Sequence, residues 1–273
     1  MSAYYQAPAP LPQGPLPVQV AVAGPVRQQR LTVLFRLILA IPHFFVLYFL
    51  GIAATVVVFI GWWAALFTGR LPDFAATFLT GYMRWYTRVT GYMMLLTDVY
   101  PPFSLEDDPY PVRIAVAQQR LNPLAVFFRI VLVIPASLLR LLLTIGAGSI
   151  VAFIAWLITL ISGELPQALH LAYAAVLRYS TRLDCYFYLL TPAYPSGLLG
   201  DATAAPAGGW EWEPADWRLI LTAAARQLVI VFVVIGALFF VAWIGIGLAI
   251  AGTSSTPTST TTATLWADAT CHC

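Results

Sequence analysis

The sequence predicts an all-α integral membrane protein built from a tandem repeat. The 273 residues are 60% hydrophobic and only 10% charged, with a mean hydropathy of +0.80. About 25% of the residues of a soluble domain are charged, and a disordered chain needs high charge and low hydrophobicity. Three apolar runs of membrane length and an internal duplication complete the evidence. These observations exclude an ordinary soluble domain and a disordered chain.

The duplication is visible as four pairs of similar segments in the same order. Their offset is 94 residues, except for one pair at 93, and such a fixed period is the mark of a structural repeat. The pairs are PVQVAVA (17–23) and PVRIAVA (111–117), FRLILAIP (35–42) and FRIVLVIP (128–135), TGRLP (68–72) and SGELP (162–166), and RWYTRVTGYMMLLTDVYP (84–101) and RYSTRLDCYFYLLTPAYP (178–195).

The duplication divides the chain into six segments. We expect a disordered Pro-rich tail, two membrane repeats, a linker, a C-terminal transmembrane helix and a disordered Ser/Thr-rich tail. In order, these are residues 1–16, repeat 1 at 17–110 with a span at about 44–67, repeat 2 at 111–199 with a span at about 136–162, the linker 200–215, the helix 216–251 with a span at about 228–250, and the tail 252–273.

Each repeat predicts the same succession of elements. Val and Ile alternate with other residues at 18–22 and at 112–116, which is the period of a strand. A short interfacial helix follows, and we expect it to end or kink at Pro42 or Pro135. The apolar run comes next, and about 20 such residues cross a bilayer core.

The last element of each repeat is an Arg-bearing amphipathic helix, at 73–97 and 167–191. One face carries small and polar residues at spacings of three and four, and the other carries aromatic and aliphatic residues. We expect the arginines of this face to bind anionic lipids or another anion, or to form structural ion pairs. The arginines are Arg84, Arg88, Arg178 and Arg182, and the candidate ion-pair partners are Asp98, Glu164 and Asp184.

Three topologies compete. If the Arg-bearing helices cross the membrane, five spans place nine arginines on the cytoplasmic side and only Arg70 outside, as the positive-inside rule favours. If they do not cross, three spans divide the arginines seven to seven. Re-entrant hairpins turning near Gly51 and Gly146 are the second choice, although Arg140 would then lie near a buried tip. We expect a cytoplasmic N-terminus and an extracytoplasmic C-terminal tail.

The sequence also resembles a known family. The segments FRLILAIPHFFVL, TGRLP and RWYTRVTGYMMLLTDVYPPFSLEDDPYPVRIAV are similar to an uncharacterised bacterial membrane-protein family, mainly actinobacterial, catalogued as domain of unknown function 4389 and often duplicated in tandem. The resemblance covers about residues 17–200 and is weaker in repeat 2. It implies a location in the cell membrane and a repeat, but no activity.

No nucleophile motif, phosphate-binding loop, dinucleotide fingerprint or helical zinc motif is present. We therefore expect a non-enzymatic accessory or scaffold subunit without a cofactor, which contacts the lipid bilayer, anionic lipids and another membrane protein. A small transporter or channel component that uses the repeated arginines is the alternative. The low net charge of +2 argues against a nucleic-acid partner. The terminal Cys271, His272 and Cys273 are only weak metal-ligand candidates, because three adjacent residues cannot close a tetrahedral site.

Overall fold

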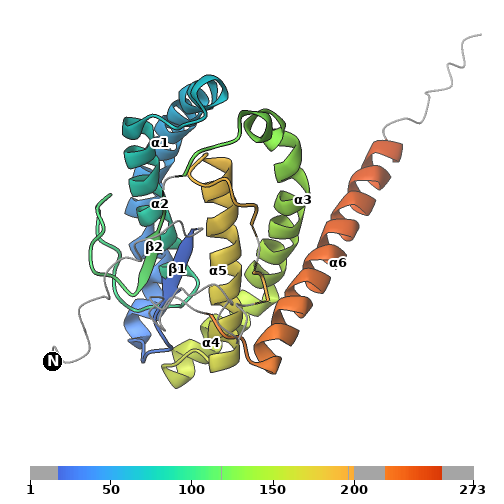
Figure 1. The fold of residues 1–273 in the computed structure, drawn as a ribbon. Helices are drawn as coiled ribbons and strands as arrows, with labels where there is room; N and C mark the ends of the chain where they lie inside the picture. The colour runs from blue at the N-terminus through green and yellow to red at the C-terminus, as the bar shows by residue number, and fades with distance from the viewer. Residues whose placement is uncertain (1–17, 118, 196, 200–218, 254–273) are drawn as a thin grey trace, which may run out of the picture.

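A computed structural model describes residues 18–117, 119–195, 197–199 and 219–253. Six helices and a two-stranded sheet occur in these residues, and Figure 1 shows their arrangement. Each repeat contributes one strand, a long apolar segment and one inner helix. The elements of repeat 1 are β1 (Gln19–Val22), α1 (Arg30–Thr68) and α2 (Asp73–Met93). Those of repeat 2 are β2 (Val112–Ala115), α3 (Pro123–Gly148), α4 (Ile150–Ser162) and α5 (Gln167–Phe187).

The elements form three layers. The sheet lies on one side of the inner helices α2 and α5. Helices α1 and α3 lie against these helices from other directions, and α4 packs on α1 and α3. Both faces of α2 are largely covered, so its apolar residue Trp85 and its polar residue Thr87 are both buried. The Arg-bearing helices are therefore the interior of the bundle, and the apolar helices form its outside.

The prolines that occur at equivalent positions of the two repeats do not end helices. Pro42 lies inside α1 and Pro135 lies inside α3, so the predicted interfacial helix and span are one continuous helix in repeat 1. Although proline removes a hydrogen bond from a helix interior, both helices continue through it. The predicted helix end or interruption at these prolines is therefore wrong.

In repeat 2 the interruption comes later, between α3 and α4, so the predicted span 136–162 is divided over two helices. Buried residues explain the position of this break. The buried Ala54 and Gly61 of repeat 1 are seven residues apart. Their equivalents in repeat 2, Ala147 and Ala155, are eight residues apart. One extra residue in a helix rotates the following side chains by about 100°, and the break at Ser149 restores the buried face.

The two repeats are related by a pseudo-two-fold axis. The strands pair antiparallel, and Val20 lies opposite Ile114, its own equivalent at the 94-residue offset. The hydroxyl groups of Thr87 on α2 and Thr181 on α5 are also equivalents, and they lie 3.4 Å apart. Equivalent residues that meet across an antiparallel pair lie on the axis. The strands of the two repeats thus pair with each other, and the repeats are antiparallel.

Reciprocal contacts at both ends of the bundle follow from this symmetry. The amide of Gln28 donates to the carbonyl of Gly163 at 2.8 Å, and the amide of Leu121 donates to the carbonyl of Gly69 at 2.9 Å. A second reciprocal pair comes from two indoles. Trp156 donates to the Val33 carbonyl at 2.9 Å, and Trp62 donates to the Val126 carbonyl at 3.1 Å. Each repeat therefore fixes the start of the other repeat's long helix.

Helix α6 (Ala223–Thr253) has no counterpart in repeat 1 and packs on α3. Glycines permit the contact: a Cβ on Gly146 would lie 1.8 Å from the Phe232 carbonyl oxygen, and one on Gly236 would lie 1.9 Å from that of Leu142. Small residues allow helix backbones to approach closely in membrane proteins. The second half of α6 extends beyond the bundle (Figure 1).

Three helices in the described part of the chain are long and apolar enough to cross a membrane. They are Arg30–Thr68, Pro123–Gly148 and Ala223–Ile250. Large apolar side chains are exposed along all three, for example Leu37, Ile130 and Leu248. The first and third expected spans therefore fall on single helices.

A cavity between the repeats and its arginines

Two buried arginines, Arg36 on α1 and Arg129 on α3, occupy equivalent positions in the repeats. Each is only 3% exposed. Arg36 donates to the carbonyl of Tyr92 and its guanidinium lies 4.3 Å from the centre of that ring. Arg129 donates to the carbonyl of Tyr186 and lies 4.2 Å from that ring centre. Because carbonyls at a helix C-terminus lack partners within the helix, these cations stabilise the ends of α2 and α5.

The four predicted arginines are divided between several environments. Arg88 is buried and donates to Asp108 at 3.2 Å and to the Glu106 carbonyl at 2.5 Å. Arg182 donates to the Val18 carbonyl at 3.2 Å, next to β1. These equivalent residues hold the inner helices to the side of the molecule that carries the sheet. The contacts favour the structural interpretation over anion binding.

The other two predicted arginines lie one turn earlier on the inner helices. Arg178 is buried on α5. Arg84 is half-buried and borders a cavity together with Glu106 and Asp107, and its Nε atom has no hydrogen-bond partner among the described residues.

All three predicted acidic partners form ion pairs, but with other arginines. Asp98 lies 3.5 Å from Arg36, and Glu164 lies 2.8 Å from Arg27. Asp184 on α5 pairs with Arg140 on α3. Sequence spacing along the amphipathic helices did not reveal these pairs, because every partner comes from a different element.

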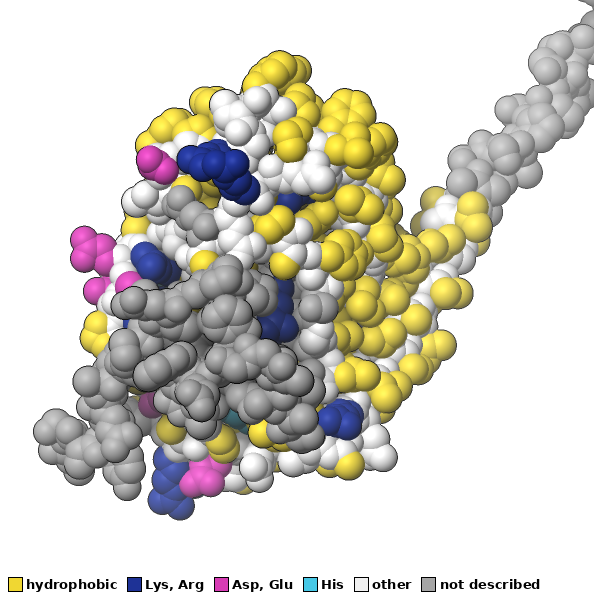
Figure 2. Space-filling view, in the orientation of Figure 1, with side chains coloured by type: hydrophobic (Ala, Val, Ile, Leu, Met, Phe, Trp, Pro, Cys, Tyr) yellow, Lys and Arg dark blue, Asp and Glu magenta, His cyan; other side chains and the backbone are white. Residues whose placement is uncertain are grey.

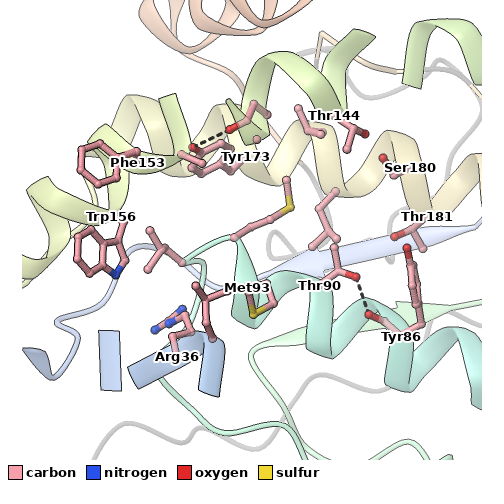
Figure 3. A pocket seen from close by; sticks show the side chains of 18 of the residues that line it. Arg36, Tyr86, Thr90, Met93, Thr144, Phe153, Trp156, Tyr173, Ser180 and Thr181 are labelled. Atoms are coloured by element: carbon pink, nitrogen blue, oxygen red, sulfur yellow. Dashed lines mark hydrogen bonds between the residues drawn. The ribbon is translucent and has the colours of Figure 1, made fainter. Parts of the chain in front are cut away.

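A cavity of about 710 Å³ lies between the repeats, which is within the range of about 300–1,000 Å³ typical of ligand sites. Five helices contribute to its lining. Figure 3 shows Phe153 and Trp156 toward one end, and Tyr86, Ser180 and Thr181 toward the other. The cavity therefore has an aromatic end and a hydroxyl-bearing end.

The Arg140–Asp184 ion pair lies at this cavity, which Arg140 lines. Burial raises the pKa of the Asp184 carboxyl above its usual range, and the charge of Arg140 opposes that rise. A paired cation and anion add no net charge to the site. The polar end of the cavity therefore offers hydrogen-bonding groups and a compensated ion pair.

The cavity breaks the symmetry of the repeats. In repeat 1 the corresponding space is filled by Tyr82, whose hydroxyl oxygen lies 3.3 Å from the Cβ position of Gly51. The equivalents in repeat 2 are Val176 and Thr144, and both line the cavity. Replacing a tyrosine with a valine removes a ring. Gly148, at the break between α3 and α4, also lines the cavity. Repeat 2 thus opens a space that repeat 1 closes.

Comparison with family models identifies the chain. The model described as domain of unknown function (DUF4389) matches residues 30–104 and 123–198, which are 75 and 76 residues and together 151 of 273. The chain belongs to the DUF4389 family. The two matches confirm the tandem repeat and correspond to α1–α2 and α3–α5 with the segments that follow them. No curated protein and no solved structure matches the chain.

Some expectations lie outside the described residues of this DUF4389 protein. These are the Pro-rich tail, the linker, most of the Ser/Thr-rich tail, and the weak metal candidates Cys271, His272 and Cys273. Among the described residues, no group of three or more His, Cys, Asp or Glu side chains could hold a metal ion.

Proposed function

We propose that this DUF4389 protein is a non-enzymatic membrane protein that holds a lipid acyl chain in the cavity between its repeats. The observation that carries the proposal is the amphipathic lining of the cavity. Its apolar part includes Leu37, Phe153 and Trp156, and its polar part includes Ser180 and Thr181. A lipid with an acyl chain and a hydrogen-bonding polar end matches such a lining.

The position of the cavity supports entry from a bilayer. Leu37 on α1 and Phe153 on α4 line the cavity, yet they are 68% and 62% exposed on the outside of the bundle. Residues that belong to both surfaces mark an opening between α1 and α4. This opening lies on the apolar outer face, where acyl chains would be available.

The lining also supports a binding role rather than a catalytic one. Among the described residues the lining includes no His, Cys, Asp or Glu, and the nearby carboxylate of Asp184 is held in the ion pair with Arg140. General acid–base catalysis most often uses these side chains. We therefore propose an accessory or scaffold subunit that contacts lipid and a partner membrane protein. The contacts of Arg88 and Arg182 to neighbouring loop and strand segments favour this role over a transporter that uses them as an anion path.

Repeat 1 supplies the design of the test. The double variant Val176→Tyr with Ser180→Tyr copies Tyr82 and Tyr86 of repeat 1 into the lining of the cavity, and the two added rings should narrow it. The variant and the wild type are purified in mild detergent, and bound lipid is extracted and quantified by mass spectrometry. We expect the wild type to retain acyl lipid in a fixed ratio, and the variant to lose most of it.

A matched control places extra bulk on the outside. Ile130→Trp changes a side chain that is 67% exposed on α3 and does not line the cavity. This control should keep the lipid ratio of the wild type. Equal lipid in the wild type and the double variant, with both proteins folded, would contradict the proposal.

A further inference from the structure

The length of α1 is the first observation that bears on how the molecule sits in a membrane. Its 39 residues correspond to about 58 Å at 1.5 Å per residue, whereas the hydrocarbon core is about 30 Å thick. Large apolar side chains are exposed along its length, from Leu31 to Phe67. A helix that crossed the membrane would leave many of these side chains in water.

The second observation is the segment that joins the repeats. At one end of the bundle the Gln28 side chain donates to the Leu95 carbonyl at 2.6 Å, and at the other end Leu121 bonds to Gly69. Residues 95–121 therefore run from one end of α1 to the other. They contain β2 but no helix among their described residues.

This segment cannot face lipid. It carries Glu106, Asp107, Asp108 and Arg113, and Glu106 is exposed. Hydrocarbon does not tolerate exposed non-helical backbone, and charged groups in it are costly. One side of the bundle must therefore be in water along the whole length of α1, which is incompatible with α1 crossing a bilayer.

The outer surface of α1, α3 and α4 is apolar, in contrast to the charged segment 95–121. Apart from Arg30 at the start of α1, their exposed large side chains are apolar, and Phe45, Val131 and Ile161 are all more than 60% exposed. The buried Arg36 and Arg129 do not interrupt this surface. In Figure 2, apolar side chains cover the side formed by α3 and α6, and arginine and acidic side chains occur on the face that carries the sheet.

We infer that the two repeats sit in one leaflet, with α1, α3 and α4 parallel to the membrane plane and the sheet in water. The pseudo-two-fold axis then lies along the membrane normal, so both repeats have the same surroundings. Only α6 crosses. All 14 arginines occur at or before Arg226 in the first turn of α6, and none follows it. The positive-inside rule therefore places the repeats on the cytoplasmic side. This seating is independent of what the cavity holds.

The two ends of α1 provide the test. Single cysteines replace Arg27 or Arg70 in a full-length chain whose native cysteines are changed to serine. A membrane-impermeant maleimide is then applied to right-side-out and inside-out vesicles. In the inferred seating both positions react only in inside-out vesicles. Reaction of the two positions from opposite sides would show that α1 crosses the membrane, and would overturn the inference.

A third position identifies what covers the apolar face. A spin label on Phe45→Cys, which is 66% exposed at the middle of the outer surface, should collide with oxygen in the bilayer but not with a water-soluble nickel complex. Collision with the nickel complex would show that water covers this face. Cross-linking of Phe45→Cys to itself would show that a second copy covers it instead. Either result would overturn the inference, whatever the lipid content of the cavity.

Discussion

Arg36 and Arg129 show how a charge can be required inside an apolar bundle. We expect Arg36→Gln to lower the free energy of unfolding by about 2 kcal/mol, because hydrogen bonds to charged groups contribute about 1.5–3 kcal/mol and the Tyr92 carbonyl would lose its charged donor and keep only the Leu95 amide. Thermal unfolding in detergent, followed by tryptophan fluorescence, measures the effect. Arg226→Gln is the control, since Arg226 is exposed. Equal unfolding midpoints for both variants would show that Arg36 does not stabilise α2.

The sequence could have indicated the role of these two residues better than that of the four predicted arginines. A single arginine at the same place in two apolar segments is costly unless it is paired, and the duplication showed that both repeats retain it. Its acceptors could not be predicted, because Tyr92 and Tyr186 lie 56 and 57 residues away. Comparison of the two repeats could not indicate the Arg140–Asp184 ion pair, since the equivalent positions in repeat 1 hold Leu47 and Thr90.

At the scale of elements, α6 depends on two glycines. We expect Gly236→Ala to separate α6 from α3, because the new Cβ would lie 1.9 Å from the Leu142 carbonyl oxygen. The unfolding midpoint of the purified protein should fall by about 4 °C or more, since 1 kcal/mol corresponds to roughly 2–4 °C at this size. Gly245→Ala is matched to it on the same helix, where nothing lies within 4 Å of the Cβ position. If both variants unfold alike, the close packing of α6 on α3 is wrong.

Helix location was more predictable than helix ends. Hydrophobic runs located α1, α3 and α6, and spacings of three and four located α2 and α5. The prediction that helices end at Pro42 and Pro135 was wrong, because a helix packed along its length tolerates one lost hydrogen bond. The break at Ser149 had a signal in the sequence: the offset between the repeats changes from 93 to 94 residues across it.

At the scale of the whole molecule, the duplication showed which residues are equivalent but not how the repeats are oriented. Parallel and antiparallel repeats give the same sequence matches. The orientation depends on the connecting segment 95–121, which runs the length of α1 before α3 begins. That orientation creates the cavity between the repeats and places both apolar surfaces on one side, so the proposed lipid site and membrane seating both depend on it.

Thiol cross-linking in the full-length protein tests this orientation most directly. Cysteine pairs are introduced at Arg27 with Glu164 and at Arg70 with Arg120, and the exchanged pairs are Arg27 with Arg120 and Arg70 with Glu164. Antiparallel repeats place the first two pairs together, as the contacts Gln28–Gly163 and Leu121–Gly69 show. We expect a short cross-linker to join only the first two pairs. Cross-linking of the exchanged pairs instead would show parallel repeats and contradict the account.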